Sequence, residues 1–180
     1  MQEGILDQQR HRLLLRLRIG CLNLGDSGLS EYLQTVFDKF ELRVRKGYYY
    51  TEDGLWASVE GGSVRVGVSD YAQRTGGDVA FVELVKQGSK VERGAEMGTL
   101  ETAKTTVSLL SPISGTVDQI NDRLAEKPEL VNSDPYGEGW MVILVPHNLE
   151  DDLKALMSAD DYFKLMLKKL DTEHKKLETR

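Results

Sequence analysis

Short runs of alternating apolar and polar residues fill the middle of this chain, from residue 55 to residue 145. Examples are residues 57–59, 64–68, 79–84, 97–100 and 107–110, and glycine pairs such as Gly61-Gly62 separate some of them. Valine and threonine are frequent in these runs, as they are in β-strands. Many short strands at close spacing predict an all-β sandwich or barrel.

A helical period is found before this region. Ser30 is a potential N-cap, and Leu33, Val36, Phe37 and Phe40 follow at i, i+3, i+4 and i+7. This spacing puts four apolar side chains on one helix face and predicts a helix that packs on the domain. Residues 42–44 then alternate and predict the start of a strand.

The tail also has helical character. Asn148 and Ser158 are N-cap candidates, and Ser158 with Asp161 forms a capping box that has Asp in place of Glu or Gln. An apolar stripe follows, made of Phe163, Met166, Leu167 and Leu170. Such a stripe predicts a face packed on the domain, with the surrounding lysines in solvent.

These patterns divide the chain into an N-terminal extension, residues 1–29, a central domain with a leading helix, residues 30–150, and a helical tail, residues 151–180. The extension interleaves leucines with Arg10, Arg12, Arg16 and Arg18. It fits either a docking arm or membrane-surface peptide or an unstructured extension.

Composition narrows the class of protein. The 180 residues have 40% hydrophobic content and a net charge of −6, which argues against nucleic acid as a partner. Cys21 is the single cysteine, so no internal disulfide can form, in keeping with a cytoplasmic protein. No run is long enough to span a membrane. Arg16 and Arg18 interrupt the leucines that could otherwise form a signal-peptide core.

The stretch from Leu100 to Val107 predicts two strands that meet at a turn near Lys104. Its tip lacks Asn-Gly, Asp-Gly and the other common hairpin signals. Taken alone, an exposed lysine in a polar turn is an ordinary solubilising charge. The absence of turn residues suggests that something other than turn propensity selected this tip.

Several motifs that follow one another in a fixed order indicate a specific role for Lys104. They are Tyr50-Thr51-Glu52 with Trp56, Val66-Gly67-Val68-Ser69-Asp70-Tyr71-Ala72-Gln73, Gly77-Asp78-Val79-Ala80-Phe81-Val82-Glu83-Leu84, Glu101-Thr102-Ala103-Lys104, Ser111-Pro112-Ile113-Ser114-Gly115 and Glu129-Leu130-Val131-Asn132-Ser133-Asp134-Pro135-Tyr136-Gly137-Glu138-Gly139-Trp140. Together they resemble the H protein of the glycine cleavage system, a free-standing lipoyl carrier. The resemblance extends from about Tyr48 to Met166.

The resemblance implies a mainly β fold, the lipoyl/biotinyl-carrier hybrid barrel-sandwich, with flanking helices at both ends. It implies that Lys104 carries covalent lipoate, with Glu101 in the Glu-x-x-Lys pattern that the lipoyl-attaching enzyme reads. The implied partners are glycine decarboxylase, an aminomethyltransferase, dihydrolipoamide dehydrogenase and the lipoyl-attaching enzyme, with no nucleic acid and no membrane. Biotin carriers usually flank their lysine with methionines, so Ala103 and Thr105 argue against biotin.

The chemistry of a carrier fits these residues. An amide between Lys104 and lipoic acid removes the ammonium charge, so the arm can enter a dry active site without desolvating a cation. Its dithiolane then acts by thiol–disulfide exchange. A catalytic nucleophile–base pair is absent from the sequence motifs, and His11, His147 and His174 lack metal-ligand spacing. The sequence therefore predicts a non-catalytic carrier without a metal.

One departure from the family leaves the pathway open. The H protein usually has His-Glu where this chain has Gly54-Leu55, and the glutamate lies where the aminomethylated arm folds back. A carboxylate there would stabilise a cationic methylamine, which Leu55 cannot do. Two alternatives therefore stand beside the glycine role: an H-like lipoyl carrier for another pathway, such as sulfur oxidation or lipoyl relay, and an unmodified interaction module.

Overall fold

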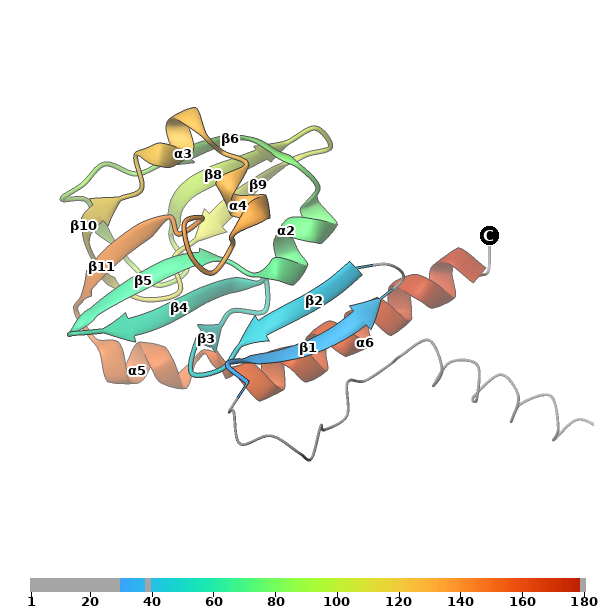
Figure 1. The fold of residues 1–180 in the computed structure, drawn as a ribbon. Helices are drawn as coiled ribbons and strands as arrows, with labels where there is room; N and C mark the ends of the chain where they lie inside the picture. The colour runs from blue at the N-terminus through green and yellow to red at the C-terminus, as the bar shows by residue number, and fades with distance from the viewer. Residues whose placement is uncertain (1–29, 38–39, 179–180) are drawn as a thin grey trace, which may run out of the picture.

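The computed structural model describes residues 30–37 and 40–178, with side chains described as far as residue 173. The protein is a mainly β sandwich with flanking helices, as expected, and its sheets do not close into a barrel (Figure 1). The N-terminal extension, residues 1–29, lies outside the described part, so nothing tests its predicted roles. The three-part division of the chain likewise remains a prediction.

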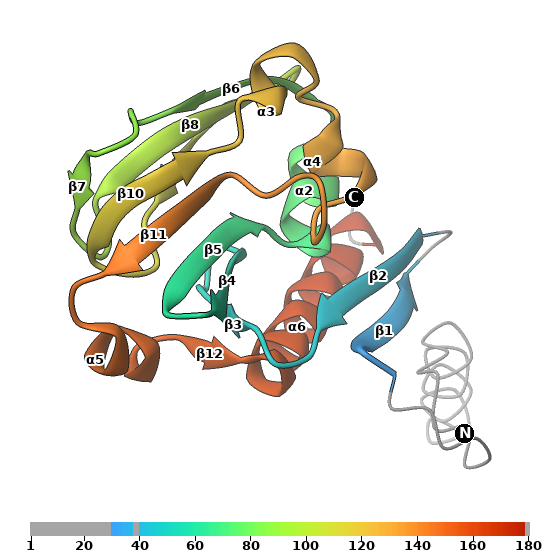
Figure 2. The same ribbon diagram turned by 60° about the vertical axis from the view of Figure 1, so that its left-hand side comes forward.

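One layer of the sandwich is a seven-stranded sheet with the strand order β12-β3-β4-β5-β11-β10-β7. Its members in chain order are β3 (Tyr49–Tyr50), β4 (Leu55–Glu60), β5 (Ser63–Val68), β7 (Lys90–Val91), β10 (Gly115–Ile120), β11 (Val142–Pro146) and β12 (Met157–Ser158). The other layer has the order β6-β8-β9, made of β6 (Val79–Leu84), β8 (Glu96–Thr102) and β9 (Thr106–Leu110) (Figure 2). Every pairing in both sheets is antiparallel.

The main hydrophobic core lies between these layers. Val64 and Val66 of β5 and Leu144 of β11 meet Met97 and Leu100 of β8 within one cluster of buried side chains. Val64 and Val66 of β5, and Val142 and Leu144 of β11, alternate with less buried residues, which accounts for the period of 2 in those parts of the sequence. At Gly61-Gly62 both glycines have positive φ, 58° and 90°, which is the backbone of a tight two-residue hairpin loop.

Short helices connect strands of the sandwich. They are α2 (Asp70–Gly76), α3 (Arg123–Glu126), α4 (Leu130–Ser133) and α5 (Leu149–Lys154), and the chain continues into the long helix α6 (Ala159–Glu178). The expected helical turn after Ser69 is confirmed, since the Ser69 hydroxyl caps α2 by accepting the Ala72 N–H at 3.2 Å. The predicted cap at Ser158 is also present, and its hydroxyl accepts the Asp161 N–H at 3.2 Å.

The predicted helix that begins at Ser30 is wrong. The chain forms a two-stranded antiparallel hairpin of β1 (Tyr32–Phe37) and β2 (Phe40–Arg45), which pairs Leu33 with Val44 and Thr35 with Leu42. Leu33, Thr35 and Phe37 therefore share one face of β1, whereas Val36 lies on the opposite face and is 41% exposed. The strand predicted at residues 42–44 is confirmed within β2.

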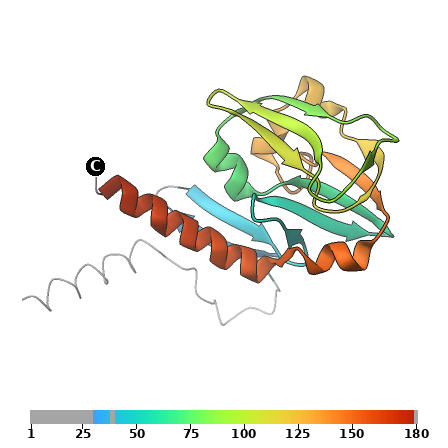
Figure 3. The same ribbon diagram turned by 180° about the vertical axis from the view of Figure 1, so that it is seen from behind.

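A second core joins the hairpin to the rest of the molecule. Leu42 and Val44 of β2, Trp56 of β4, and Tyr162 and Met166 of α6 are buried in one cluster. The Tyr50 and Tyr162 rings stack with centroids 4.5 Å apart. Helix α6 therefore fixes the hairpin against the sandwich, as the view from behind shows (Figure 3).

Two further observations concern the described residues only. No helix among them is long and apolar enough to cross a membrane. Likewise, residues 30–37 and 40–173 contain no group of three or more His, Cys, Asp or Glu side chains that could hold a metal ion.

Candidate functional site

Lys104 lies at the tip of the β8–β9 hairpin. The two strands pair Leu100 with Val107 and Glu101 with Thr106. Because β8 ends at Thr102 and β9 begins at Thr106, residues 103–105 connect them. Below the tip, Leu100 and Leu109 are buried in the main core, so the hairpin stands on packed side chains. The structure thus provides a rigid base for the lysine.

The hydroxyl of Thr102 explains how this turn forms without the usual turn residues. Thr102 is 6% exposed, and its Oγ1 accepts the N–H groups of Lys104 and Thr105, both at 3.2 Å. The same hydroxyl donates to the Thr105 carbonyl at 3.1 Å, and the Thr102 N–H donates to that carbonyl at 2.9 Å. A side-chain oxygen therefore supplies the hydrogen bonds of the tip, as serine and threonine do in other short turns.

The side chain of Lys104 is exposed and extends past Gly77. A Cβ atom added to Gly77 would lie 3.8 Å from Lys104 Cδ, 3.8 Å from Cε and 3.9 Å from Nζ. Lys104 makes no ion pair with any residue whose side chain the structure describes. Its amine is therefore open to solvent and available for acylation.

Glu101 is exposed on β8, where its Cα partners are Phe81 of β6 and Thr106 of β9. It forms no ion pair with Lys104, although the two residues are three apart in sequence. Both side chains are accessible on the same hairpin.

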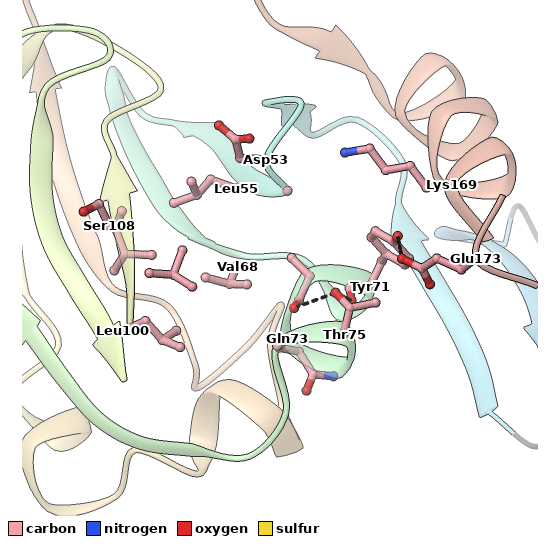
Figure 4. Close-up of a pocket in the computed structure, with 15 residues that line it drawn as sticks. Asp53, Leu55, Val68, Tyr71, Gln73, Thr75, Leu100, Ser108, Lys169 and Glu173 are labelled. Atoms are coloured by element: carbon pink, nitrogen blue, oxygen red, sulfur yellow. Dashed lines mark hydrogen bonds between the residues drawn. The ribbon is translucent and has the colours of Figure 1, made fainter. Parts of the chain in front are cut away.

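A cavity of about 420 Å³ opens beside this hairpin (Figure 4). Leu55, Val68, Leu100, Val107 and Leu109 make an apolar floor, so both strands of the Lys104 hairpin contribute to it. Gly76 lines the same cavity and is the neighbour of Gly77, past which the Lys104 side chain extends. A chain attached to Lys104 could therefore lie in this cavity.

Charged groups from distant segments surround the opening. Asp53 precedes β4, and Lys169 and Glu173 come from α6 (Figure 4). The Lys169 ammonium donates to the Glu52 carbonyl at 2.8 Å, and the Tyr71 hydroxyl donates to the Glu173 carboxylate at 3.4 Å. Burial, and secondarily the negative charge of Glu173, raises the pKa of Tyr71 to about 12, so Tyr71 remains a neutral donor at physiological pH.

Lys104 and Glu101 lie on one hairpin, as the sequence predicts, but no sequence pattern indicates this cavity. Its walls come from residues 53–55, from α2 and from α6, which are separated by as much as 120 positions along the chain. The residue that sequence analysis singled out as a departure, Leu55, forms part of the floor. No local pattern marked Asp53 or Glu173 as its companions.

Replacing Thr102 with valine should loosen the tip, because valine keeps the shape of threonine but offers no acceptor for the two N–H groups. We expect the free energy of unfolding to fall by about 1 kcal/mol. We also expect the Lys104 and Thr105 amides to exchange with solvent deuterium at least about tenfold faster, as in a locally open segment. Thr102→Ser retains the hydroxyl and is the control, with slow exchange at both amides. Equal exchange in all three proteins would contradict this account of the turn.

The fold and the site together define a β-sandwich carrier protein that offers one free amine on a rigid hairpin. A family model for the glycine cleavage H-protein matches residues 48–169. The chain belongs to the glycine cleavage H-protein family, whose members are non-catalytic, lipoate-bearing carrier components of the glycine cleavage system.

Individual relatives agree with this assignment. The probable glycine cleavage system H protein of Thermococcus kodakarensis is 46% identical over 123 residues, which cover 68% of this chain and 91% of that protein. The H protein of Salinibacter ruber is 45% identical over 114 residues, which cover 63% of this chain and 91% of that protein. The crystal structure of an H protein from Mycobacterium marinum matches with a TM-score of 0.61 and 31% identity, covering 66% of this chain and 95% of the other. The β1–β2 hairpin lies before the matched residues.

Proposed function

We propose that this chain is the lipoyl carrier of a glycine cleavage system, with lipoate joined by an amide to Lys104. The observation that carries the proposal is the free, exposed amine of Lys104 on the β8–β9 hairpin of an H-protein fold. Glu101, exposed on the same hairpin, is available for the lipoyl-attaching enzyme to read. The lipoyl group would supply a dithiolane for thiol–disulfide exchange, and the protein would supply its position.

In this role the arm visits three enzymes. Lys104 would hold the lipoyl group, which would supply the chemistry for moving an aminomethyl group from glycine decarboxylase to an aminomethyltransferase and for reoxidation by dihydrolipoamide dehydrogenase. A flexible arm on a rigid base suits this work, because attachment raises the local concentration of the group at each docked enzyme. The hydrogen bonds of Thr102 keep the base of the arm still while the arm itself moves.

The cavity beside the hairpin is suited to hold the loaded arm between visits. Its floor is apolar, as the hydrocarbon part of a lipoyl arm requires. Leu55 cannot hold a cationic methylamine, but the carboxylates of Asp53 and Glu173 line the same cavity. A cationic arm end would therefore still find acidic groups there, which favours the glycine role despite the replacement of the usual glutamate.

A second candidate is an H-like lipoyl carrier that serves another pathway. Two features favour it: Leu55 in the cavity floor, and the β1–β2 hairpin that lies outside the residues matched by the family. In that case the arm, the attachment at Lys104 and the fold would be the same. Only the donor and acceptor enzymes would differ.

Aminomethyl transfer from glycine separates these candidates. We expect the lipoylated chain, mixed with purified glycine decarboxylase, aminomethyltransferase and tetrahydrofolate, to form methylenetetrahydrofolate in a glycine-dependent way, and the unmodified chain to form none. A chain that is lipoylated but inert here, yet is reduced and reoxidised with enzymes of another lipoyl system, would establish the second candidate. A chain that stays unmodified in cells with active lipoylation would contradict both candidates and favour an unmodified interaction module.

A further inference from the structure

The two edges of the β1–β2 hairpin differ: the outer edge of β2 is partly occupied, and that of β1 is open at its centre. The Lys46 N–H donates to the Glu31 carbonyl at 2.8 Å. This bond shows which of the opposite residue pairs in the hairpin are joined by backbone hydrogen bonds and which are not. By that alternation Leu33, Thr35 and Phe37 exchange hydrogen bonds with β2, while the backbone groups of Gln34 and Val36 point away from it. The same rule points the backbone groups of Arg43 away from β1.

Part of the outer edge of β2 is occupied, because backbone groups of Arg43 and Arg45 have side-chain partners there. The Arg43 N–H donates to the Asp70 carboxylate at 3.0 Å, and the Arg43 carbonyl accepts the Tyr136 hydroxyl at 2.9 Å. On β1, by contrast, the outward N–H and C=O groups of Gln34 and Val36 have no partner within the part of the chain that the structure describes. β1 is therefore an open strand edge, which is the part of a sheet that accepts a further strand.

Leu33 of this edge belongs to a set of partly buried apolar side chains around the second core. Leu33 of β1 and Phe163 and Leu167 of α6 are only half-buried, although they pack against the second core. Phe163 and Leu167 follow Tyr162 and Met166 by one residue, which turns them by about 100° from the buried face of α6. A strand added to β1 with apolar residues on its inner side would increase the burial of Leu33.

The chain itself contains a segment of the required kind. Residues 15–20, Leu15-Arg16-Leu17-Arg18-Ile19-Gly20, repeat four of the six residues of Leu42-Arg43-Val44-Arg45-Lys46-Gly47. The second of these segments includes the end of β2, where Leu42 and Val44 are buried and Arg43 is exposed. In the first segment the same alternation would place Leu15, Leu17 and Ile19 inward and the arginines outward.

We propose that residues 15–19 pair with the open edge of β1 and extend the hairpin to a three-stranded sheet over α6. The 12 residues from 20 to 31 form the connection and include Gly20, Gly25 and Gly28. A connection of this length can span about 40 Å when extended, far more than the 4.8 Å between neighbouring strands. The outward arginines would lie beside Gln34 and Val36, which are neutral, so no like charges face each other across the new pair.

Hydrogen exchange in the full chain tests this pairing residue by residue. We expect the Gln34 and Val36 amides to be protected in the wild type and to exchange about 100-fold faster in Leu17→Pro, because proline removes a donor and disrupts a strand. The Leu33 and Thr35 amides, which face β2, should stay protected in both and report that the hairpin is intact. Gln8→Pro, outside the repeated segment, is the matched control and should leave Gln34 and Val36 protected.

Other occupants of the edge would give other results. Protection of Gln34 and Val36 that survives Leu17→Pro and rises with protein concentration would assign the edge to a second copy of the chain and overturn the proposal. Rapid exchange of both amides in the wild type would show an open edge and would also overturn it. None of these outcomes depends on lipoylation, so the test is independent of the proposed carrier function.

Discussion

Replacing Lys104 with arginine should abolish lipoylation of this protein. Amide formation needs a neutral amine that can attack the activated lipoyl carbonyl, and the guanidinium of arginine stays protonated in proteins. In cells with active lipoylation, the intact mass of the wild type should exceed the mass of the bare chain by about 188 Da, while that of Lys104→Arg should not. Because Lys104 is exposed, the free energy of unfolding should change by less than about 0.5 kcal/mol.

Lys86→Arg is the matched control, because Lys86 is also an exposed lysine in a loop of the sandwich. It should retain the full mass increase and the glycine-dependent activity. A mass increase that persists in Lys104→Arg would place the attachment on another lysine. A wild type that shows only its bare mass under the same conditions would remove the basis of the carrier proposal.

The β sandwich could be predicted from sequence because its signals are local. Each strand has its own alternation, and turns such as Gly61-Gly62 require backbone conformations that glycine alone adopts easily. The hairpin of β1 and β2 could not, because Leu33 and Phe37 fit both a helix stripe and one face of a strand. Tertiary contacts favour the strand over the helix. Asp70 and Tyr136, which are 27 and 93 positions from Arg43 in the sequence, form hydrogen bonds with its backbone N–H and carbonyl groups.

Some features of the candidate site could likewise be predicted from the sequence, and others could not. The position of Lys104 near a turn followed from the strands on either side of it, and the structure places it at the tip. The cause of that turn, the Thr102 hydroxyl, was hidden, because threonine in a strand predicts the strand and not the turn after it. The cavity was also hidden, because Leu55, Tyr71 and Glu173 meet only once α6 has packed against the sandwich.

Gly67→Ala should cost more stability than any surface change in this protein. Gly67 of β5 is the Cα partner of Trp56 of β4, and a Cβ atom added there would lie 2.5 Å from Trp56 Cζ2. Trp56 cannot move aside without loss, because it is fully buried and its indole N–H donates to the carbonyls of Val68 and Pro135, both at 3.0 Å. We expect the free energy of unfolding to fall by about 3 kcal/mol, at the upper end for an overpacked core.

Urea denaturation measures this loss, with Gly76→Ala as the matched control. A Cβ atom added to Gly76 at the end of α2 would meet nothing within 4 Å, so that variant should be as stable as the wild type or about 0.5 kcal/mol more stable.

A double-mutant cycle then tests whether the indole causes the loss. Trp56→Phe removes the part of the ring that meets the new Cβ atom, but leaves two carbonyls without their donor, for an expected loss of about 2 kcal/mol. If the clash is the cause, Gly67→Ala combined with Trp56→Phe should be more stable than the sum of the two changes predicts, by about 1 kcal/mol. Additive losses would mean that Gly67 is needed for its backbone and not for the space that it leaves to Trp56. The same indole packs against Tyr48, with ring centroids 5.2 Å apart, so its displacement would also loosen the attachment of the β1–β2 hairpin.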